Sequence, residues 1–124
     1  MGLGKTVQAI AFLNTVYNEE KNVKLLVVWP AGLIENWRRE INTFAKELKV
    51  FCHHGFNRLQ SINQFEDYVI TLTSYNTLTR DFDLFSKIKF NVIIADEAQN
   101  IKNKNTQNAK TLRNLNSISR VLLT

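Results

Sequence analysis

The chain opens with the stretch Met1-Gly2-Leu3-Gly4-Lys5-Thr6, and a segment of helical period follows it. A Gly-Lys-Thr triplet is typical of the end of a phosphate-binding loop, where backbone N–H groups surround phosphate oxygens at the start of a helix. Glycine lets the backbone approach a ligand closely, Lys5 can bridge the β- and γ-phosphates of a nucleotide, and Thr6 can place its hydroxyl on Mg²⁺. The rest of this signature would precede Met1, so an ordinary turn at a helix start is the alternative interpretation.

A second stretch, Val92-Ile93-Ile94-Ala95-Asp96-Glu97-Ala98-Gln99, is an apolar run that ends in two carboxylates. If the run is a buried parallel strand, Asp96 and Glu97 emerge at its carboxyl end, where open α/β sheets bind ligands. In phosphoryl transfer, one such acid orients Mg²⁺ and the other orients the attacking water or accepts its proton. An isolated Asp-Glu pair more often caps a turn, but its combination with the Gly-Lys-Thr loop predicts a nucleotide-binding protein.

Short apolar runs rich in β-branched residues recur along the chain and predict strands that are covered on both faces. They lie at residues 25–29, 69–72, 92–95 and 121–123, with a weaker candidate at 50–53. Segments of helical period separate them. This alternation predicts an α/β fold with a parallel sheet, flanking helices and right-handed crossovers.

Three segments predict helices from the spacing of their apolar residues. The first, after the opening loop, carries Ile10, Leu13 and Tyr17. The second, from Gly32 onward, carries a stripe of Leu33, Trp37, Ile41, Phe44 and Leu48. The third carries Ala109, Leu112 and Leu115, with Thr106 as its N-cap. Residues 75–86 are expected to form helix and loop.

Composition restricts the chain to few classes of protein. Its 124 residues, 44% of them apolar, suit one compact domain with a core. Sixteen Lys and Arg against eleven Asp and Glu give a net charge of +5, which is compatible with a polyanionic partner but does not require one. Cys52 is the only cysteine, which excludes an internal disulfide and a cysteine-based metal site. The adjacent His53 and His54 would point to opposite faces of a strand, so we expect a strand end or loop rather than a metal pair.

The sequence carries no signal-peptide pattern and no apolar run of the ~20 residues that a membrane span requires. We therefore expect no membrane association and a cytoplasmic location. A bacterial protein would be nucleoid-associated, and a eukaryotic one would be nuclear.

The order of motifs resembles that of the SWI/SNF-type ATPases of helicase superfamily two, over the whole chain. Residues 1–10 look like motif I, residues 26–37 with their Asn36-Trp37 are similar to motif Ia, and residues 70–75 resemble motif Ib. Asp96-Glu97-Ala98-Gln99, followed by Ile101-Lys102-Asn103, resembles motif II. Residues 120–124 look like the strand that enters motif III.

This resemblance implies a RecA-like nucleotide-binding lobe that takes ATP and Mg²⁺. Residues 1–124 would be a partial N-terminal lobe, running from motif I to the start of motif III, without its first strand and without the second lobe. Gly2, Gly4, Lys5 and Thr6 would bind phosphate, Thr6 and Asp96 would hold Mg²⁺, and Glu97 would position water. Gln99 would report the nucleotide state to the DNA site.

The resemblance also implies a grip on double-stranded DNA. Backbone N–H groups near Ala31-Gly32 and at the Thr73-Ser74 turn would contact phosphates, without reading base sequence. For Ser74 the alternative is a cap on the next helix, and for Trp37 it is a place in the core. Lys102, Lys104 and Lys110 would face either nucleic acid or solvent.

The leading functional hypothesis is therefore an ATP-dependent translocase on double-stranded DNA, in which a second lobe supplies arginines to the transition state. One alternative is another superfamily-two helicase that unwinds RNA or DNA. Another is a non-catalytic nucleotide- or nucleic-acid-binding fragment. We expect the isolated chain to lack ATPase activity and to be poorly stable, because its final strand would expose an unpaired edge.

Overall fold

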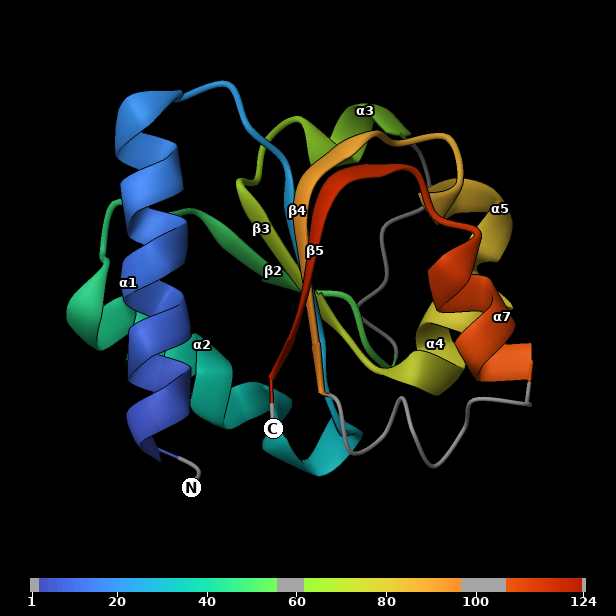
Figure 1. The fold of residues 1–124 in the computed structure, drawn as a ribbon, viewed down its shortest axis with the longest axis horizontal. Coiled ribbons are helices and arrows are strands. Elements are labelled where there is room, and N and C mark those ends of the chain that lie inside the picture. The colour runs from blue at the N-terminus through green and yellow to red at the C-terminus, as the bar shows by residue number, and fades with distance from the viewer. Residues whose placement is uncertain (1–2, 56–61, 97–106, 124) are drawn as a thin grey trace.

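The structure is a computed structural model that describes residues 3–55, 62–96 and 107–123 (Figure 1). These residues contain a five-stranded sheet of order β2-β3-β1-β4-β5, in which every neighbouring pair is parallel. The strands span Leu25–Val28 (β1), Val50–Cys52 (β2), Ile70–Thr73 (β3), Phe90–Asp96 (β4) and Ser117–Leu123 (β5). The predicted parallel sheet is confirmed, and each strand overlaps its predicted range.

Helices cover both faces of the sheet, α1 and α2 on one side and α4, α5 and α7 on the other (Figure 1). The helical elements are α1 (Leu3–Glu19), the 3₁₀ turn η1 (Ala31–Leu33), α2 (Ile34–Phe44), α3 (Ile62–Phe65), α4 (Tyr75–Arg80), α5 (Phe82–Phe85) and α7 (Gln107–Arg113). The helices predicted after the opening loop, within residues 75–86 and around Leu112 are confirmed. The short helix α3 was not predicted, and Thr106 lies outside the described residues.

Two hydrophobic cores lie on the two faces of the sheet, and the central strands contribute to both. In β1, Leu25 and Val27 belong to the core under α1 and α2, whereas Leu26 and Val28 belong to the core under α4 and α7. Side chains alternate across a strand, so a continuous apolar run supplies both cores. Burying one such side chain contributes about 1.5–3 kcal/mol relative to leaving it exposed. This burial explains why apolar runs predicted the strands.

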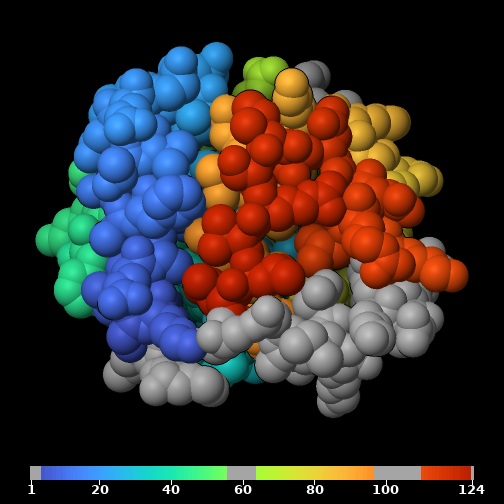
Figure 2. Space-filling model, in the orientation of Figure 1, coloured from blue at the N-terminus to red at the C-terminus, as the bar shows by residue number. Residues whose placement is uncertain are grey.

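The last strand is longer than the apolar run that predicted it. It begins at Ser117 rather than Val121, and it pairs with β4 from Phe90↔Ser117 to Asp96↔Leu123. Within the part of the chain that the structure describes, β5 pairs with β4 alone, and Ile118 on it is 64% exposed. Figure 2 shows β5, in red, on the surface of the molecule beside α1, in blue. An edge strand tolerates polar and exposed residues, so an apolar run marks only its better buried end.

The predicted apolar stripe of the second helix was partly wrong. Leu33 is 45% exposed in η1 and Phe44 is 55% exposed at the end of α2, whereas Ile34, Trp37 and Ile41 are buried. At about 100° per residue, Leu33 and Phe44 lie on one flank of the stripe. Ile34 lies on the other flank, and that is the flank that faces the sheet. Leu48 is buried as expected, but α2 ends before it.

Candidate functional site

The carboxyl ends of the parallel strands meet at one edge of the sheet, the lower edge in Figure 1. The N-terminal end of α1 lies at this same edge, as do η1 after β1 and α4 after β3 (Figure 1). Open α/β sheets bind ligands at this edge. The predicted site residues that the structure describes all belong to elements that start or end here.

Gly4, Lys5 and Thr6 form the first turn of α1, which begins at Leu3. The N-terminal end of a helix carries a partial positive charge and N–H groups without intrahelical partners, so it favours an anion. Lys5 adds a full positive charge at this point. The start of α1 therefore has the charge that a phosphate group needs.

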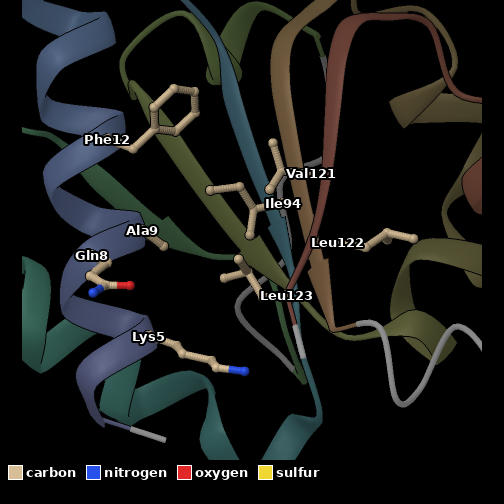
Figure 3. Close-up of a pocket in the computed structure, with 8 residues that line it drawn as sticks. All are labelled: Lys5, Gln8, Ala9, Phe12, Ile94, Val121, Leu122 and Leu123. Carbon is tan, nitrogen blue, oxygen red and sulfur yellow. The ribbon is translucent and has the colours of Figure 1, made fainter. Parts of the chain in front are cut away.

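An open pocket of about 370 Å³ lies between α1 and the two last strands (Figure 3). It is lined by Lys5, Gln8, Ala9, Phe12, Ile94, Val121, Leu122 and Leu123. Figure 3 shows the Lys5 side chain reaching from α1 toward the carboxyl end of β5. Most of the lining is apolar, so the polar chemistry of this region is concentrated at the Lys5 end.

Asp96 lies at the end of β4, on the same edge as Lys5. It is paired in register with Leu123, and Leu123 lines the pocket together with Lys5. Side chains two residues apart on a strand share a face, so Asp96 lies on the face of Ile94, which also lines that pocket. The structure thus brings Lys5 and Asp96 to one edge and one face of the sheet.

Packing within the chain does not require a glycine at position 4. A Cβ built on it would meet nothing within 4 Å, and its φ is not in the left-handed region. Glycine inside a helix costs about 0.5–1 kcal/mol relative to alanine, and the open space beside Gly4 leaves room for a ligand to approach the backbone. Together with the hydroxyl of Thr6 and the carboxylate of Asp96, which are hard oxygen ligands, these residues fit a phosphate group with Mg²⁺.

Several predicted residues fall outside the described part of the chain. They are Gly2, Glu97, Gln99, Lys102 and Lys104. Their predicted roles stay predictions. Lys110, which the structure does describe, is exposed in α7.

The first predicted nucleic-acid turn, Ala31-Gly32, is open to solvent. Both residues are exposed in η1, directly after β1 and Pro30. A Cβ on Gly32 would meet nothing within 4 Å. The main chain of this turn is therefore accessible to a large ligand.

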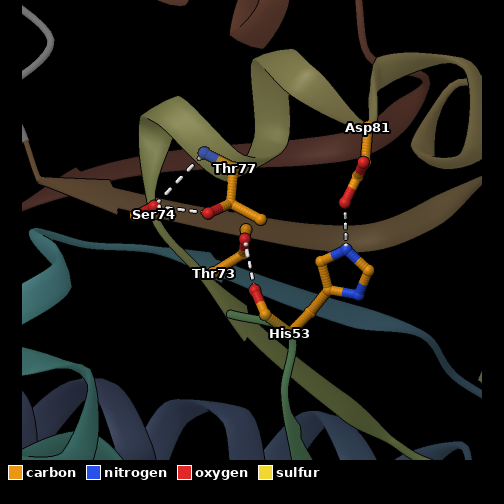
Figure 4. A network of polar contacts seen from close by, with 5 residues as sticks. All are labelled: His53, Thr73, Ser74, Thr77 and Asp81. Atoms are coloured by element: carbon orange, nitrogen blue, oxygen red, sulfur yellow. Dashed lines mark hydrogen bonds and ion pairs between the residues drawn. The ribbon is translucent and has the colours of Figure 1, made fainter. Parts of the chain in front are cut away.

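The second predicted turn, Thr73-Ser74, is buried and hydrogen-bonded (Figure 4). The Thr73 hydroxyl donates to the carbonyl oxygen of His53 at 2.9 Å. Ser74 Oγ accepts from the backbone N–H of Thr77 at 3.3 Å and donates to Thr77 Oγ1 at 3.0 Å. Ser74 is thus the N-cap of α4, which confirms the capping alternative. Because Thr73 is 0% exposed and Ser74 is 6% exposed, only the main chain beside Ser74 is left for a phosphate contact.

His53 is fully buried directly after β2, as the prediction of a strand end allowed. Its Nε2 lies 2.7 Å from Asp81 Oδ2, and its ring packs against Phe85 with centroids 5.0 Å apart. The sequence carries no signal that relates His53 to Asp81. The pair ties the end of β2 to the junction between α4 and α5 (Figure 4).

Tyr75 makes a second contact that sequence reasoning missed. Its hydroxyl donates to the backbone carbonyl of Asp96 at 3.3 Å. Burial raises the pKa of Tyr75, and the negative charge of Asp96 raises it further. The phenol therefore remains a protonated donor beside the carboxylate.

Other residues have structural roles. Trp37 is 1% exposed and packs edge-on against Trp29 with ring centroids 5.2 Å apart, which confirms its place in the core. Burial raises the pKa of the Cys52 thiol to about 11, so it is a poor nucleophile near neutral pH. Within the described ranges, no three His, Cys, Asp or Glu side chains gather as a metal site, and none of the helices there has the length and apolarity to cross a membrane.

Comparisons with known proteins agree with this geometry. A family model described as the SNF2-related domain matches residues 1–124. A human SWI/SNF-related matrix-associated actin-dependent regulator of chromatin, subfamily A containing DEAD/H box 1, is 40% identical over 133 residues, which are 100% of this chain and 13% of that protein. The chromatin-remodeling ATPase INO80 of Arabidopsis thaliana is 37% identical over 137 residues, which are 100% of this chain and 9% of that protein.

A solved structure is similar over the same range. The Sulfolobus solfataricus SWI2/SNF2 ATPase core in complex with dsDNA matches with a TM-score of 0.87 and 37% identity, over 100% of this chain and 26% of that chain. The Sulfolobus solfataricus SWI2/SNF2 ATPase core domain matches with a TM-score of 0.85 and 37% identity, over 100% of this chain and 25% of that chain. This chain therefore has the fold of part of a SWI2/SNF2 ATPase core, and it belongs to the SNF2-related domain family.

Proposed function

We propose that this chain is the nucleotide-binding part of a DNA-dependent ATPase that uses ATP hydrolysis to move along double-stranded DNA. The observation that carries the proposal is that Lys5, at the start of α1, and Asp96, at the end of β4, lie at one edge and on one face of the sheet. The chain spans 13% of the human relative and 26% of the archaeal core. The activity is accordingly proposed for the whole protein.

In this proposal each residue of the edge has a distinct role. Gly2 and Gly4 let the backbone approach the phosphates of ATP, and Lys5 neutralises the charge of the β- and γ-phosphates. Thr6 and Asp96 would hold Mg²⁺, which neutralises phosphate charge when bound. Glu97 would orient the attacking water, and Gln99 would relay the nucleotide state.

Duplex DNA is the proposed partner, and it would be held through its phosphates. The exposed main chain of Ala31 and Gly32 and the main chain of Thr73 and Ser74 lie at the same sheet edge. Backbone N–H groups bind phosphates without reading bases. The similarity to an ATPase core solved with dsDNA supports this partner, and a second RecA-like lobe would complete the DNA site and the ATP site.

The test is ATP hydrolysis by the full-length protein with duplex DNA, single-stranded DNA, RNA or no nucleic acid. We expect duplex DNA to stimulate hydrolysis, and Lys5→Ala to lower the stimulated rate by about 100-fold or more, because an electrostatic contact to the transferring phosphoryl group is lost. Lys21→Ala is the control, since Lys21 is exposed beyond α1 and contacts Asn18 and the Tyr17 ring. We expect it to have the wild-type rate.

The outcomes separate the proposed motor from its alternatives. Equal hydrolysis with and without DNA, or full activity of Lys5→Ala, would contradict the proposal. Stimulation by RNA alone would favour an RNA helicase. Binding of ATP without any turnover by the full-length protein would favour a non-catalytic module. The isolated chain is expected to show no turnover.

A further inference from the structure

Tyr75 lies between the two proposed sites. It is the first residue of α4 and directly follows the Thr73–Ser74 turn that is proposed to contact DNA. Its hydroxyl donates to the backbone carbonyl of Asp96 at 3.3 Å, at the end of the strand that carries the proposed Mg²⁺ ligand. The Tyr75 side chain therefore links the residue after this turn to the main chain at the end of β4.

The contact spans a strand. β1 lies between β3 and β4 in the sheet, so Tyr75 reaches from beyond the end of β3 across to the end of β4. Tyr75 belongs to the core on the α4 and α7 face, whereas Lys5 lines a pocket on the α1 face. Tyr75 and the pocket that Lys5 lines therefore lie on opposite faces of the sheet, and the Tyr75 hydroxyl reaches the main chain at the end of β4.

The turn before Tyr75 is held firmly. Ser74 caps α4 through Thr77, and the Thr73 hydroxyl is bonded to His53, whose ring is in turn bonded to Asp81 (Figure 4). Tyr75 itself is 5% exposed and packed among apolar side chains. Because packed interiors deform little, a ligand that displaces this turn would displace the Tyr75 ring with it.

We propose that the Tyr75 hydroxyl is a positioning group that couples DNA contact at the Thr73–Ser74 turn to the placement of Asp96. The proposal rests on the proposed function. Tyr75 acts through the Asp96 backbone and touches neither ATP nor the reacting atoms. When DNA shifts the turn, the hydrogen bond carries that shift to Asp96 at the end of β4.

A purely structural role for the hydroxyl predicts a different result. If the bond only satisfies a buried phenol, its loss lowers the amount of folded protein and reduces every activity by the same factor. If the bond couples two sites, its loss changes the influence of one ligand on the other. Coupling between two binding events is reciprocal. If the variant weakens the effect of DNA on nucleotide affinity, it must weaken the effect of nucleotide on DNA affinity by the same factor.

The experiment uses Tyr75→Phe in the full-length protein, which removes one oxygen and keeps the ring. Tyr68→Phe is the matched control, because Tyr68 is half-buried and packs on Phe51 with ring centroids 5.0 Å apart. For each variant, kcat and KM for ATP are measured with and without duplex DNA. DNA affinity is measured with and without a non-hydrolysable ATP analogue.

We expect Tyr75→Phe to keep the basal rate within about twofold and to lower the DNA-stimulated kcat by about fivefold or more, a loss within the usual range of coupling. The ratio of DNA affinities with and without the analogue should fall toward one. Tyr68→Phe should match the wild type in each of these measurements. Hydrogen exchange of the peptide over residues 92–96 checks the fold, and DNA should protect this peptide in the wild type but not in Tyr75→Phe.

Three results would overturn the inference. Full DNA stimulation of Tyr75→Phe excludes the coupling role. An equal loss of basal and stimulated rates, or the same loss in Tyr68→Phe, assigns the hydroxyl to structure alone. A wild-type protein without DNA stimulation overturns the proposed function and the coupling with it, whereas the first two results leave the proposed function intact.

Discussion

Two turns at the same edge of the sheet have opposite characters. The turn after β1 contains Ala31 and Gly32, is exposed, and starts at a Pro30 that makes no side-chain capping bond. The turn after β3 contains Thr73 and Ser74, is buried, and is bonded through side chains on both sides. Both follow a central parallel strand, and both were predicted to offer backbone N–H groups to DNA.

The difference bears on the two roles proposed for this edge, contact with DNA and coupling to the nucleotide site. An exposed turn without side-chain bonds can meet a ligand directly, and its substitution should alter binding more than stability. A buried, bonded turn costs stability when it is changed, because its polar groups lose partners that water cannot replace. Position after a strand is therefore not enough to assign a role, and the hydrogen bonds around the turn have to be known.

The largest expected effect comes from removing His53, which supports the buried turn. We expect His53→Ala to destabilise the region by roughly 2–4 kcal/mol, because a fully buried ring and its bond to Asp81 are lost. Hydrogen exchange of peptides over residues 50–53 and 70–73 in the full-length protein measures this local unfolding.

The neighbouring His54→Ala is the control for that experiment. His54 is exposed, so its replacement should change the free energy of local unfolding by no more than about 0.5 kcal/mol. Equal exchange in the two variants would show that the buried turn does not depend on the His53–Asp81 pair.

A smaller effect is expected from the cap of the buried turn. Ser74→Ala removes the acceptor for the Thr77 N–H and the donor to Thr77 Oγ1, which should cost about 1–2 kcal/mol of local stability. Exchange of the amides of α4 is the measurement. Ser119→Ala, at an exposed position of β5, is the control and should leave α4 unchanged. Unaltered exchange in Ser74→Ala would show that the cap contributes nothing.

The sequence was sufficient for the features that depend on local pattern. Apolar runs predicted the strands because both faces of the sheet are covered. The change from apolar residues to Asp96 predicted the end of β4, and the carboxyl ends of parallel strands lie at the edge where ligands bind. Lys5 and Asp96 were predicted to lie at one edge of the sheet, and the structure places Lys5 at the start of α1 and Asp96 at the end of β4, both at that edge.

Features that depend on long-range packing could not be predicted. The bonds from His53 to Asp81 and from Tyr75 to Asp96 join residues that only the folded sheet brings together. The flank of α2 that faces the sheet also depends on tertiary packing, which is why the predicted apolar stripe included Phe44 although Phe44 is exposed. Residues 97–106 lie outside the described part of the chain, so the predicted role of Glu97 stays a prediction.

The smallest effect on stability is expected at the exposed Ala31-Gly32 turn. A substitution there tests most directly whether the two turns differ in DNA contact. A Cβ on Gly32 meets no atom within 4 Å, so Gly32→Ala should change local stability by less than about 1 kcal/mol, and in the stabilising direction if the backbone conformation suits alanine. If DNA phosphates approach this main chain closely, the same methyl group should weaken duplex binding several-fold. Titration of DNA-stimulated ATP hydrolysis would show a higher half-saturating DNA concentration with an unchanged maximal rate. An unchanged half-saturating DNA concentration would mean that DNA does not approach the main chain at Gly32. The proposed difference in role between the exposed turn and the buried turn would then lack its DNA-binding half.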